Sequence, residues 1–188
     1  MRISYVTGNP GKFENARKFF TEYDVEVDQI TSKIEEIQSD DSLEIAIDKA
    51  QRAFELEKKP LFVNDATWII PALKGFPGPF MKYVNQWFEP VDFIHLMQGK
   101  DDRRIILRDS IVFINEQGYK IFTHDHEGYI LDEVASFEYK HPTDVVISLS
   151  KSKKSIAEEK ANGSFFIEDE DKVWKELAQW LKTKKNID

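Results

Sequence analysis

"RISYVTGNPGKFENARKFF", residues 2–20, begins like a strand and ends like a helix, with a glycine-containing turn between the two. Its opening residues are mostly apolar, with β-branched and aromatic side chains, and they stop at a cluster of turn formers, residues 8–11. From Lys12 onward, apolar residues recur at helical spacing to about Tyr23. A strand that ends in such a turn and opens a helix leaves backbone N–H groups that can bind an anion.

The loop itself has two interpretations. Thr7 and Asn9 add side-chain hydrogen-bond donors, and Lys12 adds a mobile positive charge, which together suit a phosphate. The spacing of a P-loop is not met, because Phe13 stands where Ser or Thr should follow the lysine. Strand-to-helix turns that contain glycine are also common without any ligand. The loop alone therefore predicts either a plain turn or an anion site.

Strand-like and helix-like segments alternate beyond this loop. Residues 25–30, "VEVDQI", alternate as a strand does, and the apolar positions of residues 42–59 fit a long amphipathic helix. Residues 60–65, "PLFVND", predict a buried strand with Asp65 at its carboxyl end. This order is typical of an α/β core in which helices pack on a sheet.

The second half of the chain contains further elements after the break at "FPGPF". Turn formers, apolar periodicity and β-branched runs locate them. We predict helical structure over residues 80–98 with a junction at Pro90, a long hairpin over 103–130 that turns at 115–118, a strand at 143–149 and an amphipathic helix over 171–185.

The composition limits both the domain count and the partners. The chain has 188 residues, of which 41% are hydrophobic, so we expect one domain over residues 1–188, with two lobes. A net charge of −8 argues against binding to nucleic acid. The chain has no cysteine, no apolar run of about 20 residues and no signal-peptide pattern. We therefore expect a soluble, cytoplasmic protein that does not bind a membrane.

Carboxylates supply the candidates for chemistry. Asp65 and the acidic stretch 32–41, "SKIEEIQSDD", would suit Mg²⁺ or the deprotonation of water if they lay beside a bound phosphate. The alternative is that Asp65 is a turn former and that the acidic stretch is a solvated surface. His124 and His126 would share one face of a strand, but they have no evident third metal ligand, and we expect a solvent-facing hairpin edge there.

Three segments in the same order resemble the inosine triphosphate pyrophosphatase family, which hydrolyses non-canonical purine nucleoside triphosphates. They are "TGNPGK" (7–12), "IEEIQ" (34–38) and "VNDATWIIPALKGFPGPFMKYV" (63–84). The family's opening loop reads Thr-Gly-Asn-x-x-Lys, and its middle segment reads approximately Val-Glu-Asp-Thr-Gly-Leu and then Leu-x-Gly-x-Pro-Gly-Pro-Tyr. The matching residues are Thr7, Gly8, Asn9, Lys12, Asp65, Leu73, Gly75, Pro77, Gly78 and Pro79.

The resemblance implies an elongated α/β fold, with a mixed, twisted central sheet, flanking helices and two lobes around a cleft, assembled as a homodimer. It also implies Mg²⁺-dependent attack of water on the α-phosphorus, which releases a nucleoside monophosphate and pyrophosphate. Carried over by position, Glu36 ligates the metal, Asp65 acts as general base or metal-side carboxylate, and Lys12 is catalytic together with Asp65 by neutralising the charged phosphate oxygens. The residues implied in substrate binding are Thr7, Gly8, Asn9, Lys12, Lys82, Lys160 and Ser164.

The chain departs from the family pattern mainly where the base would be held. In "EEKANGSFF" (158–166), Lys160 and Ser164 keep their spacing, but Phe165 and Phe166 replace a His-Arg pair that reads the base. His141 also stands where the family has an aspartate. Two polar donors have become aromatic, which favours an altered or relaxed base preference.

The departures in the first half are fewer. In the middle motif, Asn64 replaces an acid and Ala66 replaces a threonine. Three hypotheses follow: an Mg²⁺-dependent nucleoside triphosphate pyrophosphatase, a catalytically impaired relative that binds a nucleotide or a protein, and an α/β domain whose loop is only a turn. The retained Lys12 and Asp65 favour the first over the second, and the match of several segments disfavours the third.

Overall fold

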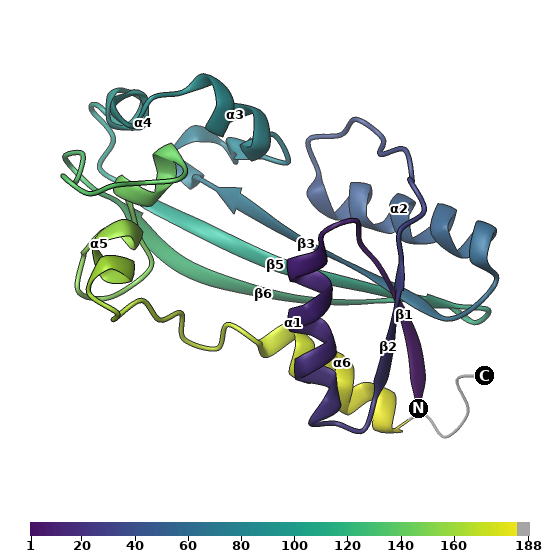
Figure 1. Cartoon of the computed structure of the whole chain (residues 1–188). Coiled ribbons are helices and arrows are strands. Elements are labelled where there is room, and N and C mark those ends of the chain that lie inside the picture. Colours follow the sequence, from purple (N-terminus) through teal and green to yellow (C-terminus); the bar gives the residue numbers. More distant parts are fainter. Residues whose placement is uncertain (184–188) are drawn as a thin grey trace. The chain divides into compact units, whose positions relative to one another are not determined.

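The computed structural model describes residues 1–183 and has a mixed α/β fold (Figure 1). Seven strands form one sheet in the order β2-β1-β3-β5-β6-β7, and β4 pairs with β3. The strands are β1 (Arg2–Val6), β2 (Glu26–Ile30), β3 (Leu61–Ile69), β4 (Pro77–Gly78), β5 (Arg104–Asn115), β6 (Gly118–Ile130) and β7 (Ile147–Ser148). The helices are α1 (Pro10–Thr21), α2 (Ser42–Glu57), α3 (Met81–Trp87), α4 (Pro90–Leu96), α5 (Ile156–Ala161) and α6 (Lys172–Thr183), with 3₁₀ helices at Pro71–Leu73 and Pro142–Val145.

The chain divides into two compact units. Unit one comprises Met1–Ala66, Asp109–His124 and the chain from Asp171 onward, and unit two comprises Thr67–Arg108 and Asp125–Glu170. None of the helices in residues 1–183 is long and apolar enough to cross a membrane.

Parallel strand pairing organises unit one. β1 pairs with β2 along its whole length, and it pairs with β3 through Ser4↔Leu61 and Tyr5↔Phe62. Both pairs are parallel, so the carboxyl end of β1 lies at the same edge as the end of β2, and Thr7 N–H donates to Ile30 O over 3.0 Å. The loop that follows β1 therefore starts beside the middle of β3.

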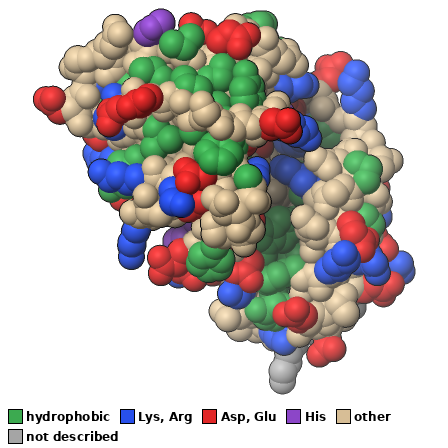
Figure 2. Space-filling view, turned by 60° about the vertical axis from the view of Figure 1, so that its left-hand side comes forward, with side chains coloured by type: hydrophobic (Ala, Val, Ile, Leu, Met, Phe, Trp, Pro, Cys, Tyr) green, Lys and Arg blue, Asp and Glu red, His purple; other side chains and the backbone are tan. Residues whose placement is uncertain are grey.

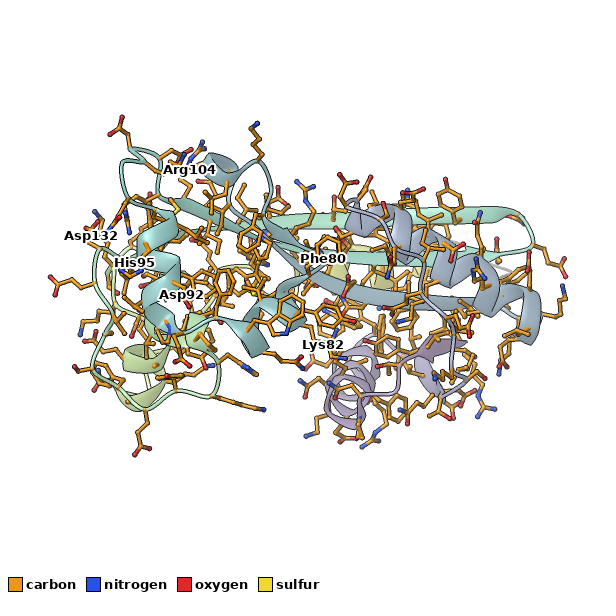
Figure 3. All side chains as sticks on the ribbon, turned by 90° about the horizontal axis from the view of Figure 1, so that it is seen from above. Phe80, Lys82, Asp92, His95, Arg104 and Asp132 are labelled. Atoms are coloured by element: carbon orange, nitrogen blue, oxygen red, sulfur yellow. The ribbon has the colours of Figure 1, made fainter. Side chains whose placement is uncertain are left out.

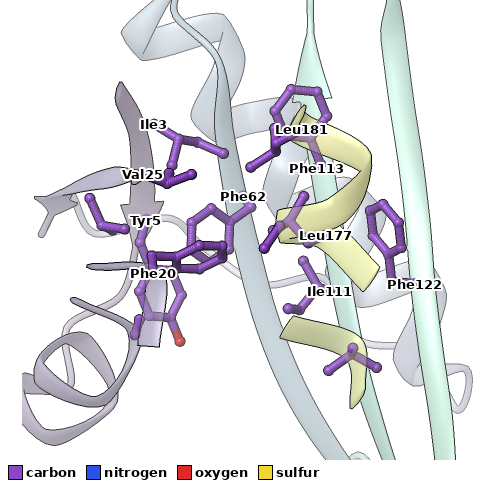
Figure 4. Packing of buried hydrophobic residues seen from close by; sticks show 14 residues of the cluster. Ile3, Tyr5, Phe20, Val25, Phe62, Ile111, Phe113, Phe122, Leu177 and Leu181 are labelled. Carbon is purple, nitrogen blue, oxygen red and sulfur yellow. The ribbon is translucent and has the colours of Figure 1, made fainter. Parts of the chain in front are cut away.

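Two separate apolar clusters fill unit one. The first contains residues of α1 and α6 together with Tyr5, Phe62 and Phe113 of the strands (Figure 4). The second contains the buried alanines of α2 with Val63 and Val112. Neighbouring residues of β3 and of β5 thus contribute to different clusters, as expected when successive strand side chains point to opposite faces of a sheet.

Aromatic rings dominate the first cluster. Phe62 is 0% exposed, and its ring stacks on Tyr5 with a centroid distance of 4.5 Å and an interplanar angle of 7°. The Phe20 ring lies 5.7 Å from the Phe62 ring (Figure 4), and the Trp174 ring lies 5.9 Å from it. Phe62 therefore joins β1, α1 and α6 to the centre of the sheet.

Unit two has its own core and one very close backbone approach. Its core includes Phe93, Met97 and the consecutive residues 145–147, each of which is at most 1% exposed. A Cβ added to Gly128 in β6 would lie 2.5 Å from the Ser148 carbonyl oxygen of β7. Only glycine fits at position 128 while these two strands pair there.

Most of the predicted elements are confirmed. The first two strands, the helix over residues 42–57, the hairpin turning after Asn115 and the two helices that meet before Pro90 all occur. The twisted mixed sheet with flanking helices is confirmed as well, whereas the two-lobed single domain around a cleft stays a prediction. Residues 184 and 185 of the predicted last helix lie outside the described residues.

Three local predictions are wrong. The strand expected to end at Asp65 continues to Ile69, so Asp65 is the fifth of nine strand residues, because Thr67, Trp68 and Ile69 extend the β-prone run. Residues 143–149 form most of a 3₁₀ helix and then a strand of two residues, since an apolar run does not by itself distinguish strand from helix. His126 is 8% exposed rather than solvent-facing, and its Nδ1 lies 3.2 Å from Glu168 O.

We predict that Phe62→Ala lowers the free energy of unfolding by about 3–5 kcal/mol, because it removes a ring that contacts three other aromatic side chains. Urea unfolding followed by circular dichroism measures the loss. Phe166→Ala is the matched control, since Phe166 is 69% exposed and its truncation should change stability by less than about 0.5 kcal/mol. Equal losses in the two variants would contradict the role given to Phe62.

Candidate active site

The loop after β1 is held by its own side chains. Asn9 is the N-cap of α1, and its Oδ1 accepts hydrogen bonds from the backbone N–H groups of Gly11 (2.9 Å) and Lys12 (3.1 Å). The N–H of Asn9 donates to Thr7 Oγ1 over 3.1 Å. Thr7 and Asn9 therefore shape the loop with their oxygens, and the Thr7 hydroxyl proton and the Asn9 side-chain amide are the groups left to donate elsewhere.

Gly8 stands at the open side of this loop. A side chain built at Gly8 would meet no heavy atom within 4 Å, so the packing of the fold does not require glycine at this position. Glycine nevertheless keeps the backbone uncovered, and Lys12, half-buried in the first turn of α1, adds a positive charge. Exposed backbone next to a helix start and a lysine is an arrangement that favours anions.

Asp65 lies in β3 among charged side chains of unit one. Burial raises the pKa of Asp65 above its ordinary value, and the nearby Glu36 raises it further. The positive charge of Lys12, the backbone N–H of Ala66 and the positive charge of Lys49 act in the opposite direction. A carboxylate with a raised pKa is better suited to accept a proton near neutral pH.

Glu36 and Lys49 form an ion pair beside Asp65. Lys49 Nζ lies 2.6 Å from Glu36 Oε1, and the Lys49 side chain is 31% exposed. Lys12, Glu36, Lys49 and Asp65 are together called the Asp65 site below. The structure thus brings the two predicted carboxylates and the predicted lysine into one electrostatic group.

Sequence reasoning missed Lys49 and Asp109. Lys49 borders the buried face of α2, three residues after Ala46 and four before Ala53, and this spacing was the available signal. Asp109 lies in β5, and its Oδ1 accepts a hydrogen bond from Asn64 Nδ2 over 2.9 Å. A contact between residues 45 positions apart leaves no signal in a single sequence.

The donor set fits Mg²⁺ when it arrives with phosphate oxygens. Among residues 1–183, no group of three or more His, Asp and Glu side chains is arranged to hold a metal ion. Glu36 and Asp65 nevertheless supply the hard carboxylate oxygens that Mg²⁺ prefers, and this ion is usually bound by one or two carboxylates together with substrate phosphates and water. The residues present are consistent with that mode of binding.

The remaining predicted site residues belong to unit two. Lys82 is exposed in the first turn of α3 (Figure 3). Lys160 of α5 lies 3.6 Å from an Asp144 carboxylate oxygen, and its Nζ is 5.2 Å from the ring centroid of Phe165. Ser164 Oγ donates to the Glu159 carbonyl over 3.4 Å, so this hydroxyl closes the end of α5.

The two aromatic residues that replace the expected His-Arg pair differ in environment. Phe165 is half-buried against the core of unit two, whereas Phe166 is 69% exposed. Phe165 therefore packs against the core, and Phe166 faces the solvent.

The mixed α/β fold is that of Ham1 structures. The chain superposes on a HAM1 protein from Coxiella burnetii with a TM-score of 0.80, over 98% of this chain and 100% of that chain, at 19% sequence identity. The model of the Ham1 family matches residues 3–179, and the chain belongs to this family. The resemblance found in the sequence is thereby confirmed.

Two named relatives are similar in sequence. A dITP/XTP pyrophosphatase of Thermococcus kodakarensis is 35% identical over 133 residues, which cover 71% of this chain and 72% of that protein. A dITP/XTP pyrophosphatase of Pyrococcus horikoshii is 29% identical over 187 residues and 97% of each chain. The similarity to the second relative therefore extends through both units.

We predict that Asp65→Asn stabilises the protein at neutral pH. Because the pKa of Asp65 is raised in the folded state, ionisation of this carboxyl opposes folding, and stability is lost as the pH rises above the ordinary value of 3.8. Removal of the charge should raise the melting temperature at pH 7 by a few degrees, as relief of a destabilised site commonly contributes about 0.5–2 kcal/mol.

Melting temperatures of wild type and Asp65→Asn between pH 3 and pH 8 check this expectation. The gain should vanish near pH 3, where both side chains are neutral. Asp102→Asn is the control with the opposite sign, because the hydrogen bond from Arg104 lowers the pKa of Asp102 to about 2. A less stable Asp65→Asn at pH 7, or a gain that is independent of pH, would refute the assignment.

Proposed function

We propose that this chain is a nucleoside triphosphate pyrophosphohydrolase, which hydrolyses a nucleoside triphosphate to a nucleoside monophosphate and pyrophosphate. The Asp65 site carries the proposal. It places a partly buried carboxylate and a lysine next to the exposed loop that leads from β1 into the start of α1. The relatives named dITP/XTP pyrophosphatase support the same activity and indicate non-canonical purine nucleotides as the substrate class.

The loop after β1 would bind the triphosphate. Its uncovered backbone at Gly8, the donors of Thr7 and Asn9 and the charge of Lys12 all favour phosphate oxygens. Local positive charge matters here because the chain as a whole carries a net charge of −8 and repels a polyanion. Lys49 adds a second positive charge to the Asp65 site, although it is shared with Glu36.

Asp65 would act as the general base. In the proposed step, a water oxygen forms a bond to the α-phosphorus while the bond from this phosphorus to the bridging oxygen breaks, and pyrophosphate leaves. The proton of the water passes to the Asp65 carboxylate. The raised pKa of Asp65 supports this role, since a proton acceptor works best when its pKa approaches the working pH.

Glu36 would hold Mg²⁺ together with the substrate's own oxygens, and Asp65 would serve either as the general base or as a second ligand of the ion. The ion, when bound, would neutralise negative charge on the triphosphate. Glu36 can leave its ion pair to bind the ion. Its side chain is 55% exposed, and among residues 1–183 it is paired only with Lys49. Glu36 would exchange this lysine for the ion.

Three of the proposed substrate-binding residues belong to unit two. Lys82, Lys160 and Ser164 are proposed substrate contacts, as the resemblance implies. The exposed ring of Phe166 supports an altered base preference, because a ring stacks on any purine without reading its 6-position by hydrogen bonding. We therefore propose weaker discrimination among bases than a His-Arg pair would give.

The assembly and the location remain proposals. Hydrophobic side chains gather on part of the surface that Figure 2 shows. The exposed apolar residues of α3, α4 and the residue before α3 include Phe80, Tyr83, Trp87 and Val91. Such a surface supports the homodimer that the resemblance implies. We also propose that residues 1–188 form a single two-lobed domain, that the protein is cytoplasmic, and that it binds neither nucleic acid nor a membrane.

We predict that wild type releases pyrophosphate and a monophosphate, rather than orthophosphate, from at least one of ITP, dITP and XTP in the presence of Mg²⁺. Asp65→Asn should lower kcat by about 10²–10⁴-fold, because the proton acceptor is lost. Lys12→Met should lower kcat/KM by about 10²–10³-fold through lost phosphate stabilisation, and Lys18→Met, whose side chain is 70% exposed on the same helix, should leave both constants unchanged.

A colorimetric pyrophosphate assay and chromatography of the nucleotides make these measurements, with the ordinary triphosphates included. If no triphosphate is hydrolysed at any pH, the proposed function is wrong, and the catalytically impaired relative becomes the better hypothesis. If Asp65→Asn remains fully active, the activity stands but the general base is another group.

We predict that Phe166→Ala raises KM by about 5–150-fold for all triphosphates alike, since loss of a stacked ring costs about 1–3 kcal/mol per base. Tyr119→Ala is the control, an exposed aromatic residue of the unit-one hairpin. Steady-state kinetics on the same panel give the values. An unchanged KM, or an effect confined to one base, would show that Phe166 does not stack on the base.

A further inference from the structure

We infer that Gln29 is a positioning residue of the proposed triphosphate site, where its side-chain amide fixes the direction of the backbone N–H of Gly8. This inference rests on the proposed function, because it concerns the loop to which we assign the triphosphate. Gln29 lies near the end of β2, its side chain is half-buried, and it contacts the first residue of that loop.

Gln29 is a polar residue on an otherwise apolar face of β2. Alternate strand residues share a face, so Gln29 follows Val27 on the side of the aromatic cluster of unit one. Val27 is 6% exposed, and Tyr5, which lies beside Gln29 in the strand register, is 0% exposed. A half-buried amide in such a row is costly unless it is hydrogen-bonded. The loop after β1 supplies its partner.

The bond from Gln29 is one of two that hold Thr7 to β2. Gln29 Nε2 donates to the Thr7 carbonyl oxygen over 2.9 Å. The Thr7 N–H donates to the carbonyl oxygen of the next residue of β2, Ile30, over 3.0 Å. Both backbone groups of Thr7 are therefore bound to β2, which fixes the orientation of the main chain where the loop begins.

The peptide group that follows Thr7 passes this orientation to Gly8. The Thr7 carbonyl and the Gly8 N–H belong to one trans, planar peptide unit, so they point in opposite directions. Because the carbonyl is bound to Gln29, the Gly8 N–H points away from β2. β1 lies between β2 and β3 in the sheet, and β3 carries Asp65. The donor is therefore directed to the side of β1 on which Asp65 lies.

The Gly8 N–H is open to a ligand, unlike its neighbours in the loop. The N–H of Asn9 donates to Thr7 Oγ1, and those of Gly11 and Lys12 donate to Asn9 Oδ1. Within residues 1–183 no acceptor is bonded to the Gly8 N–H, and Gly8 is exposed. Backbone N–H groups beside a helix start are favourable donors to phosphate oxygens.

The value of the Gln29 bond is that it orders this donor before the substrate arrives. Without the bond, the peptide unit between Thr7 and Gly8 could rotate, and ordering it on binding would cost free energy. The N–H would contact the triphosphate both in the bound substrate and in the transition state. Loss of such a contact raises KM and leaves kcat unchanged. Gln29 acts through Gly8 and does not itself touch the substrate.

The first test is Gln29→Met, which keeps the length of the side chain and removes the donor. Calorimetric titration of the full chain with inorganic triphosphate and Mg²⁺ should show about 3–10-fold weaker binding, as expected for one hydrogen bond. KM should rise by a similar factor for every triphosphate that is hydrolysed, while kcat and the melting temperature stay close to wild type. Gln179→Met, at an exposed glutamine of α6, is the matched control and should change none of these values.

A double-variant cycle tests whether Gln29 acts through Gly8. Gly8→Pro removes the backbone N–H, and it should weaken the binding of inorganic triphosphate by about tenfold or more. Once this donor is absent, Gln29→Met should cause no further loss, so the two effects should not add. Additive losses would show that Gln29 acts on another part of the site, and they would overturn the inference.

Nuclear magnetic resonance decides the same point if Gly8→Pro does not fold. The chain has 8 glycines, so ¹⁵N-glycine labelling gives a simple spectrum in which the Gly8 signal is identified by its loss in Gly8→Ala. Inorganic triphosphate with Mg²⁺ should move the Gly8 amide proton signal downfield in wild type and by a clearly smaller amount in Gln29→Met. Equal shifts in the two proteins would contradict the positioning role.

The outcomes separate this inference from the proposed function. If wild type hydrolyses no triphosphate but binds inorganic triphosphate, the proposed function fails, and the binding measurements still decide the role of Gln29. If Gln29→Met binds and hydrolyses like wild type, the inference fails and the activity stands. Wild type that does not bind inorganic triphosphate also overturns the inference. If Gln29→Met is unstable, Gln29→Glu replaces it, because a carboxylate cannot donate to Thr7, and unchanged binding then has the same meaning.

Discussion

The stacking of Tyr5 on Phe62 is the contact on which the rest of unit one depends. It fixes β1 against β3 in parallel register, and this register decides where the loop after β1 meets the polar part of β3. A slip by one residue would exchange the two faces of the strand and move Asp65 away from Lys49 and Glu36. The positions of the site residues therefore depend on the aromatic packing of the core. The core holds these residues in place and also stabilises unit one.

Much of the fold could be predicted because its signals are local. The turn formers after β1, the helical spacing of residues 42–57 and the hairpin turn after Asn115 each depend on neighbours in sequence. The end of β3 was misjudged because Asn64 and Asp65 look like the polar end of a strand. The sheet tolerates them in mid-strand because the loop and the charged group around Asp65 give them polar surroundings.

Some residues of the candidate site are likewise predictable from local sequence, and others are not. Lys12 and Asp65 stand in segments whose residue order is informative, so a single sequence identifies them as candidates. Lys49 enters only through its ion pair with Glu36, a contact between distant parts of the chain. The neighbour of Asn64, Asp109, could likewise be found only from the strand order.

The ion pair between Glu36 and Lys49 has a consequence for how the site responds to its surroundings. Each partner is also the natural partner of something else, Glu36 of a cation and Lys49 of a phosphate. A metal-bound triphosphate offers both at once, so the pair can open without leaving either charge uncompensated. A bare anion or a bare cation offers only one. In the proposed function, this ion pair would therefore favour the joint binding of metal and nucleotide over the binding of either one alone.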